Sequence, residues 1–441
     1  MNPIVLGVDT GGTFTDFVWW HQGRLRLLKL PSTPDAPERA VLEGIQQLGV
    51  ASAPQGFTLL HGTTVGTNLI LERKGARTAF LTTAGFRDLL FLARQDRKSL
   101  YSLKPEPHPC LAERAYCAEV PERVAYDGTV LRPLDVSGLD RLVRRWKRQG
   151  IEAVAVCLLF AYANPAHERA LKRLLAPHFA VSLSSEVAPE FREYERASTT
   201  FLNAYLTPPM TRSLQSLQHL ARGVGAGRIL LSHSAGGLMD VARACVHPVS
   251  TILSGPAAGV IGAWAVGRAV GAHRLLTLDI GGTSTDIALI DREPLRTQVG
   301  AIEGLPLRLP RLDVHTLGAG GGSIARLDAA GGLRVGPESA GADPGPAAYG
   351  KGAQPTLTDA HLVLGHLLPQ TFGFGKVAID PDLSAKALEP LASALGLSRW
   401  EAAAAVVEQA QVKMARGLRR VSAGRGVNPE SCTLIAFGGA G

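Results

Sequence analysis

The segment Asp9-Thr10-Gly11-Gly12-Thr13-Phe14-Thr15-Asp16 is echoed 270 residues later by Asp279-Ile280-Gly281-Gly282-Thr283-Ser284-Thr285-Asp286. Each copy lies between two apolar runs, the pattern of two strands joined by a tight glycine turn. Walker loops and Rossmann turns differ, because there the glycines open a helix. One repeat at so long a period predicts two related halves that face each other, rather than a solenoid.

The residue types of the repeat suit phosphate and Mg²⁺. Glycines let backbone N–H groups approach an anion, and threonine hydroxyls add donors. Mg²⁺ prefers a few carboxylates together with phosphate oxygens, so Asp9 and Asp279 are the candidates for holding Mg²⁺ and water. A single copy could be a plain hairpin turn, but two matching copies favour a grip on the β- and γ-phosphates of ATP. The predicted phosphate contacts are Gly11, Gly12, Thr13, Thr15, Asp16, Gly281, Gly282, Thr283 and Thr285.

Composition describes a folded protein of two to four domains. The chain has 441 residues, of which 46% are hydrophobic and 19% charged. The net charge of +8 comes from scattered arginines, which favours solvated helix faces over nucleic-acid binding. Five cysteines without metal-ligand spacing indicate a reduced, cytoplasmic protein. No signal peptide is recognisable, and no apolar run reaches 18 residues, so no membrane span is expected.

Strand and helix patterns alternate along the chain, which argues for α/β layers. A boundary is expected near Val187, giving domains 1–187 and 188–441. Helices are expected at 37–48, 139–149, 165–175, 190–206 and 402–421, and strands at 57–60, 78–81, 152–160 and 433–437. The glycine-rich stretch 318–352 is either a linker or a place where backbone approaches a ligand.

The duplicated hairpin resembles the two phosphate motifs of the actin, Hsp70 and sugar-kinase ATPase superfamily. The segment 434–441 resembles the adenosine motif of that superfamily, which makes Gly438 and Gly439 cofactor-binding candidates. More specifically, the chain resembles the hydantoinase A / 5-oxoprolinase family, which includes acetone carboxylase β-type subunits. The ordered motifs that carry this resemblance lie at 61–68, 85–88, 192–200, 254–259, 315–323, 341–346 and 358–360.

The resemblance implies a two-lobed, actin-like (ribonuclease H-like) α/β fold that uses ATP and Mg²⁺. The implied reaction opens a cyclic amide, such as a hydantoin or 5-oxoproline, after ATP phosphorylates the amide carbonyl oxygen. The family often works with a B-type subunit, and we expect an oligomer. Two alternatives are an ATPase subunit of an acetone-type carboxylase and a nucleotide-binding module without catalysis. Relatives usually continue beyond the adenosine motif, so the second lobe is expected to be truncated at Gly441.

Two further groups are candidates for substrate chemistry. His61, Thr63 and Thr64 follow a predicted strand, in a loop that could reach the cleft, and with Asn68 they would suit hydrogen bonding to an amide ring. The alternative is a capped turn that starts a helix at 65–74. Arginines in the segment 94–97 could hold a substrate carboxylate, although such a pair is more often a surface feature. These arginines are Arg94 and Arg97.

Asp313, His315 and Asp359, together with His361, have side chains of metal-ligand type, and the resemblance implies a metal site nearby. The chain departs from the family where relatives tend to have Pro-Ala-Cys-Tyr-Gly, because residue 348 is alanine. It also departs where they tend to have Thr-Asp-Ala-Asn, because His361 stands in place of the asparagine. A structural role is therefore favoured over an additional divalent metal.

Overall fold

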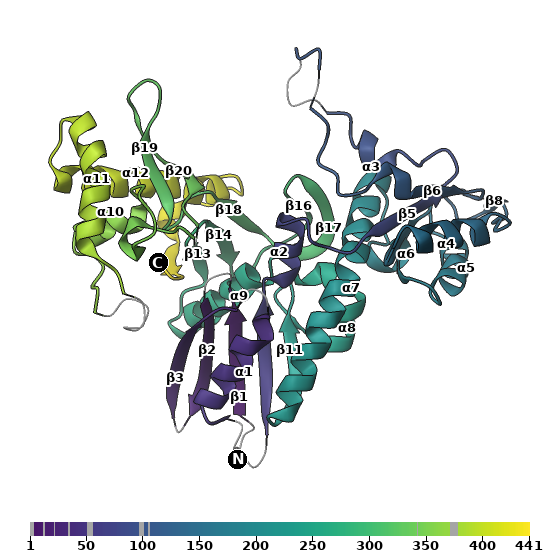
Figure 1. The fold of residues 1–441 in the computed structure, drawn as a ribbon, viewed down its shortest axis with the longest axis horizontal. Helices are drawn as coiled ribbons and strands as arrows, with labels where there is room; N and C mark the ends of the chain where they lie inside the picture. The colour runs from purple at the N-terminus through teal and green to yellow at the C-terminus, as the bar shows by residue number, and fades with distance from the viewer. Residues whose placement is uncertain are drawn as a thin grey trace.

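The computed structural model describes residues 4–11, 14–21, 23–33, 36–50, 56–96, 101–104, 106–341, 343–370 and 378–441. Three predicted site residues, Gly12, Thr13 and Arg97, lie outside these ranges. The chain forms two central lobes and a distal domain on one side (Figure 1).

The first lobe is built on a six-stranded sheet in the order β12-β11-β4-β1-β2-β3. Burial alternates along its central strand β4, so that one face meets the core and the other meets a less buried layer. The strands are β1 (Ile4–Thr10), β2 (Phe14–His21), β3 (Arg24–Pro31), β4 (Phe57–Thr63), β11 (Ala226–Ser232) and β12 (Leu238–Asp240). Helices α1 (Pro37–Gln47), α2 (Val65–Leu71), α7 (Glu193–Gly223) and α8 (Val241–Val246) belong to this lobe. Because β11 and β12 join β1–β4, the expected boundary at residues 187/188 does not separate the sheets.

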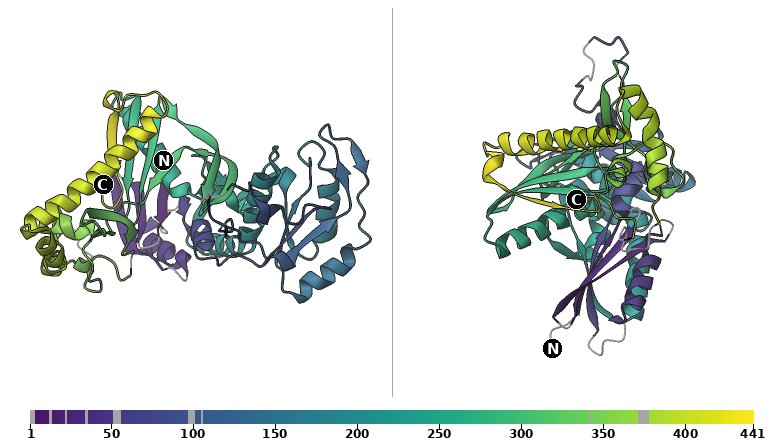
Figure 2. Two further views of the ribbon diagram at one scale, coloured as in Figure 1. Left: turned by 90° about the horizontal axis from the view of Figure 1, so that it is seen from above. Right: turned by 90° about the vertical axis from the view of Figure 1, so that its left-hand side faces the viewer.

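The second lobe repeats the hairpin plan in a sheet ordered β15-β14-β13-β21, with β18 also paired to β14. Its strands are β13 (Arg274–Ile280), β14 (Thr285–Asp291), β15 (Glu293–Pro294), β18 (Val314–Leu317) and β21 (Thr433–Phe437). Successive residues point to opposite faces: Leu275 packs in a cluster with α9 (Ser254–Ala269), and Leu276 packs in the cluster of α12 (Arg399–Ala423). Helices α9 and α12 therefore cover opposite faces, as the right-hand view of Figure 2 shows. The remaining elements here are β19 (Ser323–Leu327), β20 (Leu333–Ser339), α10 (Leu357–Val363) and α11 (Pro381–Leu395).

The distal domain is a parallel sheet in the order β10-β9-β5-β6. Strands β5 and β9 are buried at every residue, as expected where both faces of a parallel sheet are covered. The elements are β5 (Thr78–Thr83), α3 (Leu89–Leu92), β6 (Cys117–Val120), β7 (Arg123–Val124), β8 (Val130–Arg132), α4 (Leu139–Arg148), β9 (Ala153–Cys157), α5 (Ala166–Leu175), β10 (Ala180–Leu183) and α6 (Ser184–Val187). The left-hand view of Figure 2 shows this domain extending away from the two lobes.

A hairpin of β16 (Arg296–Ile302) and β17 (Leu305–Leu312) connects the second lobe to α7. The Ser198 hydroxyl on α7 donates to the Pro306 carbonyl oxygen at 2.9 Å. The Arg308 amide donates to the Thr199 hydroxyl, also at 2.9 Å. Helix α7 is thus the common support of the first lobe, the distal sheet and this hairpin.

The predicted elements are confirmed, with shifted ends. The helix expected at 190–206 becomes α7, whose 31 residues continue through Pro208 and Pro209. Proline removes a backbone hydrogen bond, but the residues beyond it, among them Met210 and Leu214, are buried in the core, and this packing maintains the helix. The strand expected at 152–160 ends at Cys157, and Phe160 follows with a positive φ of 54°. In the part of the chain that the structure describes, no helix combines the length and apolarity needed to cross a membrane.

Candidate active site between the two hairpins

Both copies of the repeat form antiparallel hairpins, as predicted. Asp9 pairs with Asp16 across β1 and β2, and Asp279 pairs with Asp286 across β13 and β14. Each turn is closed in the same way: the Gly11 amide donates to the Phe14 carbonyl oxygen, and the Gly281 amide donates to the Ser284 carbonyl oxygen, both at 2.9 Å. The sequence repeat is therefore also a repeat of backbone geometry.

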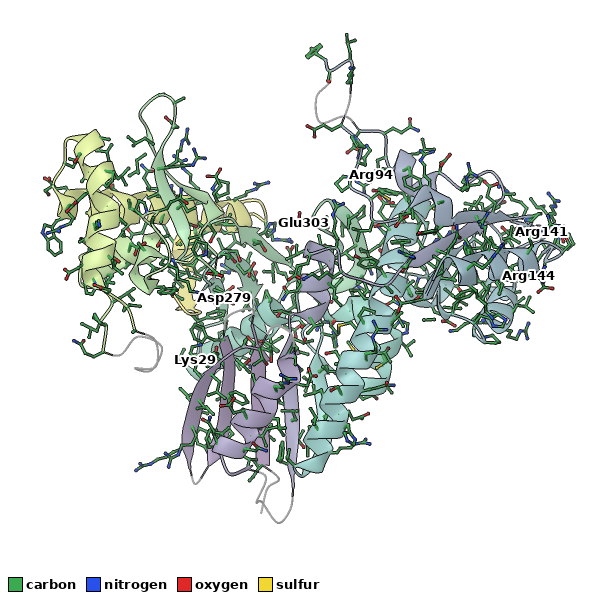
Figure 3. All side chains as sticks on the ribbon, in the orientation of Figure 1. Lys29, Arg94, Arg141, Arg144, Asp279 and Glu303 are labelled. Atoms are coloured by element: carbon green, nitrogen blue, oxygen red, sulfur yellow. The ribbon has the colours of Figure 1, made fainter. Side chains whose placement is uncertain are left out.

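Asp9 and Asp279 belong to different hairpins, yet the charge of Asp9 contributes to the pKa of Asp279. Burial, then the charge of Asp286, then that of Asp9 raise the pKa of Asp279 to about 6. Burial and the charge of Asp16 raise the pKa of Asp9, while Lys29 lowers it. Two carboxylates from different sheets thus have raised pKa values, a situation that a bound cation would relieve. Figure 3 shows Asp279 and Lys29 where the two lobes meet.

Each of these aspartates faces a glycine that lies on the neighbouring parallel strand or directly after it. A methyl group at Gly62 on β4 would lie 2.6 Å from Asp9 Oδ1. A methyl group at Gly438, directly after β21, would overlap Asp279 Oδ1. Gly438 also has a φ of +97°, a conformation that favours glycine. Gly438 and Gly439 were predicted to contact adenosine; in this structure Gly438 makes room for the carboxylate of the second hairpin.

Helix α9 begins between the two aspartates. A methyl group at Gly255 would lie 3.9 Å from Asp9 Oδ1, and one at Gly259, a turn further on, 3.4 Å from Asp279 Oδ2. The first turns of α9 therefore pass both carboxylates. A helix N-terminus presents free N–H groups and a positive dipole end, which favour anions. The Ser254–Gly259 motif supports the resemblance, but sequence reasoning did not assign it to the site.

The glycine-rich segment that starts at Gly318 packs against the second turn and is not a linker. The Gly321 amide donates to the Gly281 carbonyl oxygen at 3.0 Å, and the Gly322 amide donates to that of Gly282 at 2.6 Å. Backbones this close leave no space for side chains: a methyl group at Gly320 would lie 2.7 Å from the Gly281 oxygen. The Thr285 hydroxyl also binds this segment: it donates to the Ala319 carbonyl oxygen at 2.5 Å.

Three polar atoms at or near the carboxyl ends of the adjacent strands β1, β4 and β11 are buried without a hydrogen-bond partner among the described residues: Thr10 Oγ1, His61 Nδ1 and Ser232 Oγ. Successive residues of a strand point to opposite faces, so Thr10 and His61, which is in register with Val8, lie on the core face and not on the face of Asp9. Ser232 is on the Asp9 side, because a methyl group at Gly62 would approach both Asp9 Oδ1 and Ser232 Oγ. Buried polar groups are normally paired, so the unpaired Ser232 hydroxyl suits a polar ligand. Ser232 Oγ, the two aspartates and the start of α9 fit a hydrated Mg²⁺–phosphate group.

The structure corrects the position of His61. It lies within β4, not in a loop, and burial lowers its pKa to about 4. The side chains of Thr63 and Thr64 both bind backbone groups: Thr63 Oγ1 accepts from the nearby Val65 amide at 3.2 Å, and the Thr64 hydroxyl donates to the Thr10 carbonyl oxygen on β1 at 3.0 Å. The Thr64 side chain therefore connects α2 to the first hairpin and does not cap the helix. Asn68 lies half-buried on α2.

Arg94 is already paired within the protein. Its Nε donates to Glu195 Oε1 at 2.6 Å, and its Nη2 contacts the same oxygen. Glu195 belongs to the first turn of α7, so the pair connects the segment after α3 to α7. The predicted role of Arg94 in holding a substrate carboxylate would require this pair to open.

The predicted metal ligands Asp313, His315 and Asp359 do not form a metal site in the structure. The Asp359 carboxylate accepts hydrogen bonds from the Ala347, Ala348 and Thr356 amides and from two hydroxyls, so its oxygens are saturated. Asp313 is instead paired with Arg425. Within the described ranges, no group of three or more His, Cys, Asp or Glu side chains could hold a metal ion.

Lys29 is a neighbour of the site that sequence reasoning missed. It faces Asp16 across β2 and β3 and forms an ion pair with it. The sequence did contain a sign of this role, because Lys29 interrupts the apolar second half of the strand 24–31. A lysine on a buried face usually has an acidic partner.

Comparison with known proteins identifies the family of this chain. The model of the hydantoinase/oxoprolinase N-terminal region matches residues 5–179, and that of hydantoinase/oxoprolinase matches residues 196–441. The chain belongs to the hydantoinase/oxoprolinase family. It is 36% identical to caprolactamase subunit alpha of Pseudomonas jessenii, over 99% of this chain and 65% of that protein. It is 33% identical to the acetophenone carboxylase gamma subunit of Aromatoleum aromaticum, over 99% of this chain and 63% of that subunit. With 5-oxoprolinase of Saccharomyces cerevisiae the identity is 32%, over 99% of this chain and 38% of that protein.

Two solved structures share this mixed α/β fold. The ATP-dependent caprolactamase of Pseudomonas jessenii superposes with a TM-score of 0.83 at 34% identity, over 98% of this chain and 65% of that one. Nucleotide-free acetone carboxylase gives a TM-score of 0.82 at 30% identity, over 100% of this chain and 66% of that one. The chain thus spans about two thirds of the length of these solved chains.

Proposed function

We propose that this chain is the ATP-binding, A-type part of an enzyme that opens a cyclic amide by hydrolysis. The observation that carries the proposal is that Asp9 and Asp279 both lie along the first turns of α9, beside Gly255 and Gly259 respectively. Support comes from the family, whose relatives include a caprolactamase and 5-oxoprolinases, and from a solved caprolactamase described as ATP-dependent.

We propose further that the two lobes are the halves of an actin-like ATPase, with ATP–Mg²⁺ between the hairpins. The matching turn closures and strand registers support this interpretation. In it, residues 1–187 carry the first phosphate motif, and residues 188–441 carry the second phosphate motif and the adenosine motif. The predicted phosphate contacts of the glycine turns belong to the same proposal.

Phosphoryl transfer requires positioning and charge neutralisation more than covalent help from the protein. The γ-phosphoryl group would pass to the amide carbonyl oxygen, releasing ADP. A first water would then add to the amide carbon, and the C–N bond would break as the nitrogen takes a proton, leaving an acyl phosphate. A second water would hydrolyse the acyl phosphate to a carboxylate and free phosphate. Asp9 and Asp279 would hold Mg²⁺, which neutralises phosphate charge when bound. The free N–H groups at the start of α9 would face the phosphate oxygens.

The test is ATP hydrolysis with ε-caprolactam, 5-oxoproline or hydantoin, with and without a B-type subunit. Asp9→Asn and Asp279→Asn should each lower turnover by roughly a hundredfold or more, because a preorganised electrostatic contact to the reacting group is lost. Asp291→Asn is the matched control, since Asp291 lies at the far end of the second hairpin and pairs with Arg274. Near-normal turnover in either site variant would refute the Mg²⁺ role.

A second candidate function, the ATPase subunit of an acetone-type carboxylase, is supported by the similarity to nucleotide-free acetone carboxylase and to the acetophenone carboxylase subunit. Stimulation of ATP hydrolysis by a ketone plus bicarbonate, but not by any cyclic amide, would favour it. ATP binding without stimulated turnover by any of these would favour a nucleotide-binding module.

A further inference from the structure

A second pocket lies in the distal domain, between the edge strand β6 and helix α4. Its volume is about 490 Å³. Volumes of this order are typical of small-molecule sites. Figure 3 places Arg141, which lines it, far from Asp279 and the hairpins. The pocket is therefore separate from the proposed ATP site.

Three arginines, Arg87, Arg141 and Arg145, line this pocket. Arg141 and Arg145 are four residues apart, so they project from the same face of α4. Ion pairs in the described chain engage other arginines, such as Arg114 with Asp88, and these three are in none of them. Three unpaired guanidinium groups around one cavity create a local positive potential.

The acidic residues that line the pocket, Glu119 and Asp135, are held by the backbone. Glu119 Oε1 accepts from the Gly85 amide at 3.0 Å and from the Arg87 amide at 3.1 Å. Asp135 Oδ1 accepts from the Ser137 amide at 2.9 Å, and hydrogen bonding from Ser137 lowers the pKa of Asp135. Because both carboxylates serve the local turns, the guanidinium groups remain available to a ligand.

Part of the pocket wall is apolar. Leu81, Val120, Leu139 and Leu142 all contribute to it. An apolar wall beside guanidinium groups matches a molecule with a hydrocarbon body and an anionic head. Guanidinium groups bind carboxylates through two parallel hydrogen bonds, and a hydrocarbon chain would bury its surface against the leucines.

We propose that this pocket binds a small aliphatic carboxylate, with the carboxylate between Arg141 and Arg145 and the hydrocarbon chain against the leucine wall. Arg87 approaches from the segment after β5 and completes the positive rim. The proposal rests on the distal domain alone and does not depend on the proposed ATP-dependent reaction.

The experiment is a calorimetric titration of the 441-residue chain with hexanoate, and separately with hexanamide and inorganic phosphate. Hexanoate should bind saturably, and Arg141→Gln and Arg145→Gln should each weaken binding roughly tenfold, as expected for loss of one charge-assisted pair. Arg144→Gln is the matched control, because Arg144 lies on the same helix but does not line the pocket. It should bind hexanoate as the unaltered chain does.

Absence of saturable hexanoate binding, or equal weakening by Arg144→Gln, would overturn the proposal. Hexanamide binding as tightly as hexanoate would overturn the role of the arginines, and phosphate binding as tightly would overturn the role of the apolar wall. Because Arg141 and Arg145 are exposed, their variants should melt as the unaltered chain does. If either unfolds, Arg87→Gln provides the same test from another element.

Discussion

Single residues at this site act mainly through the space they leave. Gly62 and Gly438 border Asp9 and Asp279, and neither position has room for a methyl group. At each place the aspartate supplies the chemical group, but the position of its carboxylate depends on a glycine that lies on, or directly after, a different strand. His61 shows the opposite case: a large polar side chain is buried on β4, and its Nδ1 has no hydrogen-bond partner among the residues that the structure describes.

We predict that Gly62→Ala impairs the site with little effect on overall folding. The added methyl group would meet Asp9 Oδ1 at 2.6 Å and rotate the carboxylate away. ATP turnover should fall by roughly tenfold to a hundredfold, as expected when a positioned charge is displaced. Gly262→Ala on α9 is the control. A methyl group at Gly262 would have no atom within 4 Å among the described residues, and alanine has a higher helix propensity than glycine. Steady-state ATPase assays measure the effect. Unchanged turnover in Gly62→Ala would show that the position of Asp9 does not depend on the space at Gly62.

We predict that His61 makes folding stability depend on pH. Its pKa is about 4 in the folded protein, whereas the ordinary value is 6.5, so between these values the unfolded chain binds the extra proton. Stability is therefore complete above pH 6.5 and is lost as the pH falls toward 4, by up to about 1.4 kcal/mol per pH unit. Urea unfolding at pH 7, 6 and 5 measures this slope. His61→Gln should flatten it relative to the unaltered chain, and an unchanged slope would show that His61 is not the titrating group.

At the scale of elements, the glycine-rich segment acts as a brace for the second hairpin. Thr358, at the start of α10, donates both its amide and its hydroxyl to the Gly321 carbonyl oxygen, at 2.7 and 2.8 Å. Gly321 in turn bonds to the turn at Gly281. The position of the second phosphate motif therefore depends on α10, about 75 residues further along the chain.

We predict that Thr358→Val weakens this brace. Valine keeps the shape but removes the hydroxyl donor, which should cost about 1 kcal/mol of unfolding free energy. Weaker ATP binding should accompany this loss, because the second turn is less well held. Thr297→Val is the control, since the Thr297 hydroxyl is bonded in an exposed strand away from the turn. Thermal melts and nucleotide titrations measure both effects; equal effects of the two variants would argue against the brace.

At the scale of the whole molecule, the β16–β17 hairpin joins the second lobe to α7, and α7 supports both the first lobe and the distal domain. Arg308 on β17 forms an ion pair with Glu190 at 2.7 Å, and the Arg308 side chain is only 11% exposed. A mostly buried pair of this kind helps to fix how two parts of a protein sit together.

We predict that Arg308→Gln loosens this connection. Removing one partner leaves Glu190 partly buried without its charge partner, which should cost about 1–3 kcal/mol. Hydrogen exchange should rise both in β17 and in the segment around Glu190, just before α7, because both sides of the contact open. The double variant Arg308→Gln/Glu190→Gln should recover part of the loss. Additive losses from the two single variants would show that the residues do not interact.

The sequence by itself determined the two hairpins, the α/β class and most element positions, because these depend on local signals: glycine turns between apolar runs, and apolar periodicity. It also placed the family, through motifs that could be read in order. The tertiary structure alone decided that Asp9 and Asp279 both lie along the first turns of α9, and that Gly62 and Gly438 make room for them. It likewise decided that Asp359 is saturated by hydrogen bonds, that Arg94 is paired with Glu195, and that α7 continues through two prolines. Each of these outcomes depends on contacts between residues far apart in the chain. Strand order and side-chain packing set such contacts, and these two factors leave no local pattern in the sequence.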